Sequence, residues 1–299
     1  MGGMASSTGM PRSRGTLNER LKRQAQAINA FLLQCQPLTL LSEIPGNIGD
    51  HLIWLGTERM LTSSGLTFDR LPMQVLQGSL SQRRKGILLI PGSGALTAKW
   101  HEWLPSLALV ASKMFERVVI LPSEFEPAVP IVHEVLLQEN VFPFAREAES
   151  YAKIKGYGRA ELALDLALWA GDCVSAQPDD YEQSPKNQLL AMRKDAGSLL
   201  VDNGFKAAKH NNDISLSCKN LSEFWGCIRE SSEVVTDRLH VAVAAVMLNK
   251  HVHYVDPYDH KISRYIRYNF QDAFHSQLHH HDPLWLMEQG LAVRLGDGV

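Results

Sequence analysis

The sequence predicts an α/β protein with two Rossmann-like domains that face each other across a cleft. Short apolar runs alternate with amphipathic stretches of helical length, which is typical of βαβ units and parallel sheets. The polar, proline-containing stretch Gly171–Lys186 separates two such series and is the best linker between them. The length of 299 residues suits two domains of roughly 150 residues.

The predicted elements follow from hydrophobic periodicity. Apolar runs predict strands at Leu38–Leu41, Ile87–Ile90, Arg117–Leu121, Val141–Phe144, Gln188–Met192, Asp213–Ser217, Val234–Thr236 and Val252–Val255. Helical patterns fall near residues 50–63, 99–114, 146–155, 220–231, 237–249 and 284–294.

The N-terminal segment is expected to stand apart from both domains. Residues 1–15 predict disorder, and Thr16–Gln36 predicts a helix with Leu17, Leu21, Ile28, Phe31 and Leu32 along one side. Its many basic residues favour a docking helix with a solvated basic face, and contact with an anionic membrane surface is the alternative. We therefore divide the chain into residues 1–36, an N-terminal domain at 37–175, and a C-terminal domain at 176–299.

Composition excludes several classes of protein. Hydrophobic residues make up 45% and charged residues 21%, which argues against disorder and against a disulfide scaffold. A formal charge of −2 argues against a nucleic-acid partner. No apolar run is long enough to span a membrane, and no secretory signal is evident. The four cysteines fit no zinc pattern, so we expect reduced thiols in a cytoplasmic protein.

Two glycine-containing turns follow predicted strands of the first domain. In Pro45–His51 the glycines and the backbone N–H groups at a helix start could bind an anion. Asp50 could equally be the helix N-cap. In Pro91–Ala95, Ser93 and Gly94 could form a backbone nest for substrate, or simply a turn.

Charged residues at two strand ends of the second domain predict the reactive part of the site. Asp237, Arg238 and His240 follow a buried strand, where charged groups are rare unless they are paired or used. Asp237 and His240 share a helix face, so Asp237 could orient the imidazole, the alternative being a cap and a packed histidine. Arg193 follows the strand at 188–192, where a guanidinium suits a carboxylate or a phosphate, with a surface salt bridge as the alternative.

Histidines are frequent near the C-terminus, from His251 to His281. His275 and His279 have the spacing of a helical metal pair, but no H-E-x-x-H motif and no nearby cysteine pair supports a metal site. We expect most of these side chains to be exposed on loops and helices.

Several motifs together resemble the polysaccharide pyruvyl transferase family. They occur in the family's order over about residues 40–270: GNIGDHLIWLG (46–56), IPGSGAL (90–96), FAREAES (144–150), LALDLALWAG (162–171), LLAMRKD (189–195) and VVTDRLHVAVAAVMLNKHVHYVDPYDHKISRY (234–265). The resemblance implies a fold like that of GT-B glycosyltransferases. It also implies transfer of pyruvate from phosphoenolpyruvate to two hydroxyls of a saccharide, giving a cyclic ketal in exopolysaccharide or cell-wall polysaccharide biosynthesis.

The resemblance also assigns site residues. Arg193, Arg238 and His240 match its donor-site positions, Lys261 falls near a family lysine, and Asn47 and Asp50 match its first-domain motif. The basic residues would neutralise the donor carboxylate and phosphate, and His240 would act as general acid and base. Asp237 and Arg238 complete the expected catalytic group.

Partners follow from the same resemblance. The acceptor would be a saccharide, lipid-linked in one version of the hypothesis, and the protein would work in the cytoplasm, with the inner face of the membrane as an alternative. Nothing in this scheme requires a metal or another cofactor.

Two other functions stay open. One is a GT-B sugar-nucleotide glycosyltransferase. The other is a non-catalytic glycan-binding member, motivated by departures from the family pattern at Ser93, Ala95 and Val241.

Overall fold

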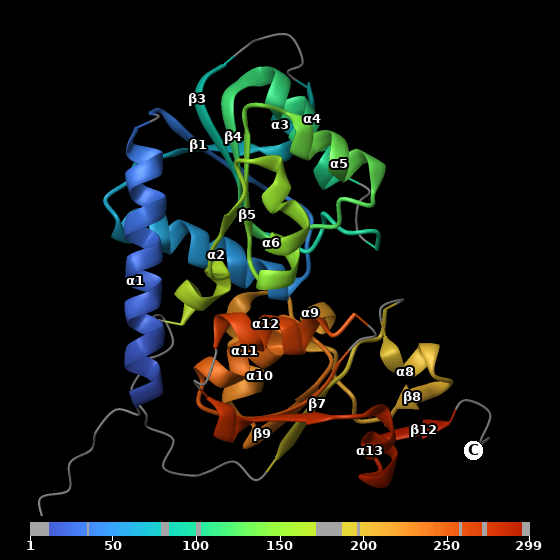
Figure 1. The fold of residues 1–299 in the computed structure, drawn as a ribbon. Coiled ribbons are helices and arrows are strands. Elements are labelled where there is room, and N and C mark those ends of the chain that lie inside the picture. Colours follow the sequence, from blue (N-terminus) through green and yellow to red (C-terminus); the bar gives the residue numbers. More distant parts are fainter. Residues whose placement is uncertain are drawn as a thin grey trace, which may run out of the picture.

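A computed structural model shows a mixed α/β protein with two parallel sheets (Figure 1). The structure describes residues 12–34, 36–78, 84–99, 103–171, 187–195, 198–256, 259–270 and 274–294. Residues 1–11 of the segment predicted to be disordered, most of the predicted linker, and two of the four cysteines (Cys35 and Cys173) lie outside these residues. Residues 12–15, which are also predicted to be disordered, instead form the start of a helix that begins at Arg12.

The first sheet has six parallel strands in the order β2-β1-β3-β4-β5-β6. Its central strands are continuous apolar runs because helices cover both faces. The strands are β1 (Leu38–Ser42), β2 (Asp69–Pro72), β3 (Arg84–Ile90), β4 (Phe115–Ser123), β5 (Val141–Ala145) and β6 (Glu161–Leu162).

The crossovers of this half are helical. They are α2 (Ile48–Ser63), α3 (Met73–Gly78), α4 (Leu104–Met114), α5 (Pro130–Leu137), α6 (Ala148–Ile154), and the 3₁₀ turns η1 (Lys155–Tyr157) and η2 (Leu166–Ala170).

The second half contains a four-stranded parallel sheet in the order β11-β10-β9-β7 and a short antiparallel pair, β12-β8. Its strands are β7 (Gln188–Ala191), β8 (Phe205–Ala207), β9 (Glu233–Thr236), β10 (His251–Val255), β11 (Leu278–His281) and β12 (Ala292–Arg294). Its helices are α8 (Leu199–Asp202), α9 (Ile214–Ser217), α10 (Leu221–Arg229), α11 (Leu239–Met247), α12 (Lys261–Asn269), η3 (His275–Gln277) and α13 (Pro283–Glu288).

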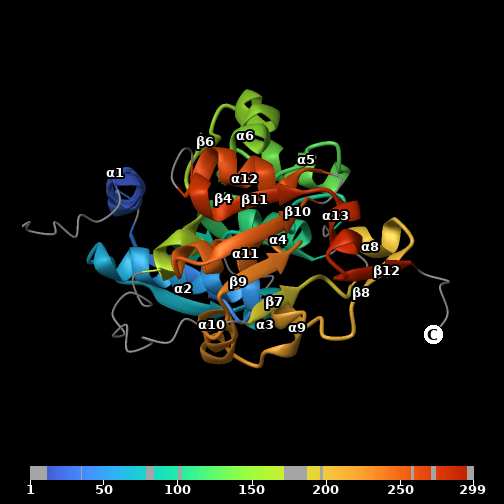
Figure 2. The same ribbon diagram turned by 90° about the horizontal axis from the view of Figure 1, so that it is seen from below.

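Helix α1 (Arg12–Leu33) lies along one side of the molecule, and β8, β12 and α13 lie on the opposite side (Figures 1 and 2). Its apolar stripe is buried as predicted, with Leu17, Leu21, Ile28 and Leu32 in the core. That core cluster includes residues of both halves, and α2 packs against η2 and α11 within it. No helix among the described residues is both long enough and apolar enough to cross a membrane.

Seven of the eight predicted strands are confirmed, and one is wrong. Residues Ile214–Ser217 form the short helix α9, because alternation over only five residues does not distinguish a strand from one helical turn. The predicted helix at 284–294 ends at Glu288, and Ala292–Arg294 continue as β12. His279, His280 and His281 lie in strand β11 rather than in a loop or helix.

Candidate active site

One pocket brings together all the site residues that the sequence predicts. Its volume is about 330 Å³, in the range of small-molecule sites. Its walls come from both halves of the chain, from the turns that follow β1 and β3 and from the segments that follow β7, β9 and β10. The predicted residues that line it are Asn47, Asp50, Ser93, Gly94, Arg193, Asp237, Arg238, His240 and Lys261.

The first turn of α2 forms one wall of the pocket. Asn47 is the N-cap, and its Oδ1 accepts the N–H of Gly49 at 2.8 Å. Asp50, expected as the alternative N-cap, is instead the N3 residue of a capping box, and its Oδ2 accepts the N–H of Asn47 at 3.0 Å. A Cβ on Gly49 would lie 3.0 Å from the Cβ of His240, so glycine permits this close approach.

The turn after β3 forms the second part of this wall. Ser93 Oγ accepts the N–H of Ala95 at 2.9 Å, and the N–H of Ser93 donates to Ser123 Oγ at 3.0 Å. A Cβ on Gly94 would lie 3.1 Å from Nζ of Lys261. The serine therefore shapes the turn, and the glycine leaves room for the ammonium group.

Both predicted arginines are already paired with carboxylates. Arg238 donates from Nε to Asp213 Oδ1 at 3.0 Å and from a terminal nitrogen to Asp213 Oδ2, and it lies 3.0 Å from Asp195 Oδ2. Arg193 donates from Nε to Asp195 Oδ1 at 2.8 Å. Asp195 thus bridges the two guanidinium groups at the pocket wall, and an anionic ligand would compete with it.

Asp237 occupies a different position from the one expected. Its Oδ1 accepts the backbone N–H of Arg193 at 2.7 Å, and its Oδ2 is buried without a hydrogen-bond partner among the described residues. Burial raises the pKa of Asp237 to about 6, although the Arg193 N–H and both arginines oppose the change.

The carboxylate that faces His240 belongs to Asp165, so the expectation that Asp237 orients the imidazole is wrong. His240 Nε2 lies 3.7 Å from Asp165 Oδ2. The Asp165 side chain is fully buried. Its Oδ1 accepts the N–H of Ala167 at 2.8 Å, and its Oδ2 accepts a hydrogen bond from the Arg146 guanidinium at 3.3 Å. Burial alone would raise the pKa of Asp165, but His240 and Arg146 outweigh that effect and lower it.

Glu124 is the centre of a second cluster of charges. Its oxygens lie 2.9 Å from Lys261 Nζ, 2.8 Å from Arg264 and 3.1 Å from Arg146. Burial acts to raise the pKa of Glu124, but the three cations lower it to about 2. The carboxylate therefore stays ionised and holds Lys261 in place at the pocket.

Sequence reasoning missed several charged residues of the site. Arg146 directly follows strand β5, which is the same signal that identified Arg193 after β7. Glu124 follows β4 in the same way, whereas Asp165 lies in a turn with no such signal. Among the described residues, no group of three His, Cys, Asp or Glu side chains is arranged to hold a metal ion.

The fold and the pocket together indicate a class of protein. Parallel sheets with basic side chains and one imidazole gathered at strand ends are typical of enzymes that act on small anionic molecules. Residues 47–260 match the model of the polysaccharide pyruvyl transferase family. The chain belongs to this family, which supports a role in pyruvyl transfer during polysaccharide biosynthesis.

Comparison with solved structures adds evidence on the fold. A functionally uncharacterised protein from Klebsiella pneumoniae subsp. pneumoniae NTUH-K2044 is 19% identical, with a TM-score of 0.68, covering 86% of this chain and 96% of that one. The Escherichia coli heptosyltransferase WaaC with ADP-2-deoxy-2-fluoro heptose is 12% identical, with a TM-score of 0.39, covering 82% and 93%. The first likeness shows a shared fold, and the second supports no inference. No curated protein matches the chain.

Proposed function

We propose that the protein transfers the pyruvyl group of phosphoenolpyruvate to two hydroxyls of a saccharide and releases phosphate. The product is a cyclic ketal in exopolysaccharide or cell-wall polysaccharide biosynthesis. The observation that supports this proposal best is that the chain belongs to this family and that its basic residues and His240 converge in one pocket. The proposal includes a GT-B-like cleft between two domains that meet near residue 175. It also places the reaction in the cytoplasm, on an acceptor that is lipid-linked at the inner face of the membrane.

The charges of the pocket suit a small anionic donor. Four basic side chains line it (Arg146, Arg193, Arg238 and Lys261), and the lining carboxylate Asp195 pairs with two of them. Asp213, Glu124 and Asp165 also pair with three of these cations and hold them at the wall. The donor carries a carboxylate and a phosphate, the latter worth about −1.5 to −2 charges at neutral pH. Its phosphate would displace Asp195 from the two arginines, since a bidentate guanidinium contact suits phosphate as well as carboxylate.

The proposed reaction begins with proton transfer. Protonated His240 delivers a proton to the methylene carbon, which becomes a methyl group and leaves an oxocarbenium-like centre at the neighbouring carbon. The first sugar hydroxyl adds to that carbon and returns its proton to His240. The second hydroxyl then displaces phosphate and loses its proton to the departing group, so atoms and charges balance.

Asp165 and the arginines have separate parts in this scheme. The Asp165 carboxylate lies 3.7 Å from His240 Nε2 in a buried site and faces the imidazole that delivers the proton. Arg193 and Arg238 hold the phosphate as negative charge grows on it. Asp237, with a pKa of about 6, is a second group that can carry a proton near neutral pH.

The test follows the new carbon–hydrogen bond. The protein is incubated in D₂O with phosphoenolpyruvate and a panel of bacterial glycans, and phosphate release and the ketal methyl signal are followed. The proposal predicts one deuterium in each ketal methyl group and one phosphate per ketal. His240→Ala should lose turnover, and full turnover in this variant would show that the assigned role is wrong.

A binding comparison separates the other two functions. Phosphoenolpyruvate should raise the melting temperature of the protein, and sugar nucleotides should not. Stabilisation by a sugar nucleotide alone would indicate a glycosyltransferase. Glycan binding with no turnover under any of these conditions would indicate the non-catalytic alternative.

A further inference from the structure

A second and larger pocket lies between α1 and the edge of the six-stranded sheet, and nothing in the proposed reaction uses it. Its volume is about 620 Å³. We call it the α1 groove. It is lined by Arg20, Arg23, Gln24, Ala27, Ile28, Phe31, Phe142, Phe144, Gly158, Arg159, Glu161, Leu162, Ala163, Leu164 and Tyr268.

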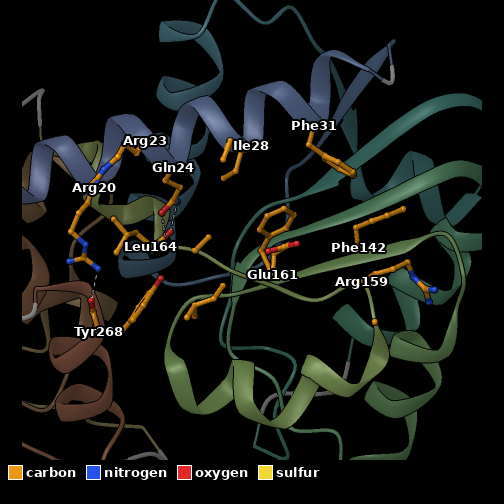
Figure 3. A pocket seen from close by; sticks show the side chains of 15 residues that line it. Arg20, Arg23, Gln24, Ile28, Phe31, Phe142, Arg159, Glu161, Leu164 and Tyr268 are labelled. Carbon is orange, nitrogen blue, oxygen red and sulfur yellow. Dashed lines mark hydrogen bonds between the residues drawn. The ribbon is translucent and has the colours of Figure 1, made fainter.

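Contacts at both ends of the groove fix α1 while the space between stays open. At one end Arg20 donates to the carbonyl oxygens of Tyr268 and Asn269, at 2.8 and 2.9 Å. At the other end the ring of Phe31 lies 5.2 Å from that of Phe142 and 6.5 Å from that of Phe144, centroid to centroid. The intervening wall is aliphatic and aromatic apart from Gln24, which bonds to the backbone of Leu164, and Glu161 (Figure 3).

Positive charge gathers at the Tyr268 end. Arg20 and Arg23 both project from α1 there (Figure 3), and Arg20 lies over the Tyr268 ring at 5.7 Å. The partners of Arg20 are the last carbonyl oxygens of α12, which carry only partial negative charge. Within the described part of the chain, no carboxylate lies within ion-pair distance of Arg20 or Arg23.

The far end of the groove has a different character. The Arg159 guanidinium turns away from the opening and donates to the carbonyls of Val141 and Gln138. Phe31 and Phe142 remain as apolar surface at this end. Glu161 lies between the two ends and is the one carboxyl group among the lining residues.

We propose that the α1 groove binds a single anionic amphiphile, a phosphate head group on a long hydrocarbon chain. The phosphate sits between Arg20 and Arg23, where guanidinium groups give charge-assisted hydrogen bonds. The chain lies along Leu162 toward Phe31 and Phe142, which are half-buried side chains with apolar surface that the ligand would remove from water. Glu161 opposes the anionic ligand, so the site is weaker than its apolar area alone would make it.

Isothermal titration calorimetry of the full chain with dodecyl phosphate, below its micelle concentration, tests the proposal. Inorganic phosphate supplies the head alone, and dodecyl maltoside supplies the same chain with an uncharged head. Dodecyl phosphate should bind at least tenfold more tightly than either. Equal affinity for dodecyl maltoside would reduce the groove to a nonspecific apolar surface, and equal affinity for phosphate would remove the role of the chain. Either result overturns the proposal.

Paired variants on α1 locate the site. Ala27→Trp fills the groove and should weaken binding at least tenfold, while Ala30→Trp, at an exposed position outside the groove, should leave it within twofold. Arg23→Gln should weaken binding severalfold and Lys22→Gln should not. Unchanged affinity in both Ala27→Trp and Arg23→Gln would refute the location.

Glu161→Gln gives a test of opposite sign that does not depend on a bulky side chain. It should tighten dodecyl phosphate binding and leave dodecyl maltoside unaffected. A loss of affinity would contradict the predicted placement of the head group. These measurements contain no phosphoenolpyruvate, so their outcome is independent of the proposed reaction.

Discussion

Replacing Asp165 with asparagine tests how the buried charges support the imidazole. The substitution keeps the shape of the side chain and an oxygen for the Ala167 N–H, but it removes the negative charge 3.7 Å from His240 Nε2. At an effective dielectric constant of about 20, two unit charges at that distance attract by about 4.5 kcal/mol. The protonated imidazole would lose an attraction of this order, and we expect kcat to fall about 10²-fold or more.

Stability should fall as well, because Asp165→Asn leaves Arg146 with Glu124 as its remaining carboxylate partner. Breaking a buried pair costs about 3–5 kcal/mol. The assay is phosphate release from phosphoenolpyruvate with an accepted glycan, at a temperature where circular dichroism shows the variant folded.

Glu124→Gln is the matched control. It also removes a carboxylate from Arg146, but Glu124 makes no contact with His240. We expect a change mainly in KM, since Lys261 loses its partner. If a folded Asp165→Asn variant keeps the wild-type kcat, or if Glu124→Gln lowers kcat equally, the argument that Asp165 supports His240 fails.

Three further predictions concern charge and pH. Asp237→Asn should raise the free energy of unfolding at pH 8 by about 3 kcal/mol, because the wild-type protein loses stability as pH rises through the raised Asp237 pKa of about 6. Urea titrations should show that this gain vanishes near pH 4, and a difference that stays constant with pH would contradict the prediction. Asp195→Asn should tighten phosphoenolpyruvate binding by up to about tenfold, or 1.4 kcal/mol, since Arg193 and Arg238 lose a competing carboxylate; weaker binding by calorimetry would show that Asp195 instead positions them. Burial lowers the pKa of His253, so the protein should lose stability as pH falls below about 6.5, and His253→Gln should reduce that loss in urea midpoints measured at pH 7.5 and 5.5.

Much of the fold could be predicted because the buried parallel strands are continuous apolar runs. Strands β3 and β4 are examples in which burial on both faces leaves an unambiguous pattern. Strand β11 has the sequence Leu-His-His-His, which local hydrophobicity does not mark as a strand. It is held in the sheet by pairing with β10 and by stacking of the His281 ring on the Trp285 ring, with centroids 3.7 Å apart. Such tertiary contacts have no signature in local hydrophobicity.

The residues that line the site could be predicted from the sequence, but the partners of their charged side chains could not. Arg193, Arg238 and His240 were found because polar side chains follow buried strands. Their partners come from distant segments, and Asp165 lies 75 positions before His240 in the numbering. Local spacing therefore favoured Asp237 as the neighbour of the imidazole, although the folded chain places Asp165 there.

The side-chain amide of Asn269 joins the two halves behind the pocket. It accepts the N–H of Asp165 at 2.9 Å and donates to the carbonyl oxygens of Arg146 and Tyr265. One fully buried amide thus fixes the backbone of Asp165, which faces the imidazole, and of Arg146, which pairs with Asp165, before any ligand arrives. Little reorganisation is left for the reacting groups, so efforts to engineer a new acceptor preference should alter the outer rim and leave the end of α12 untouched.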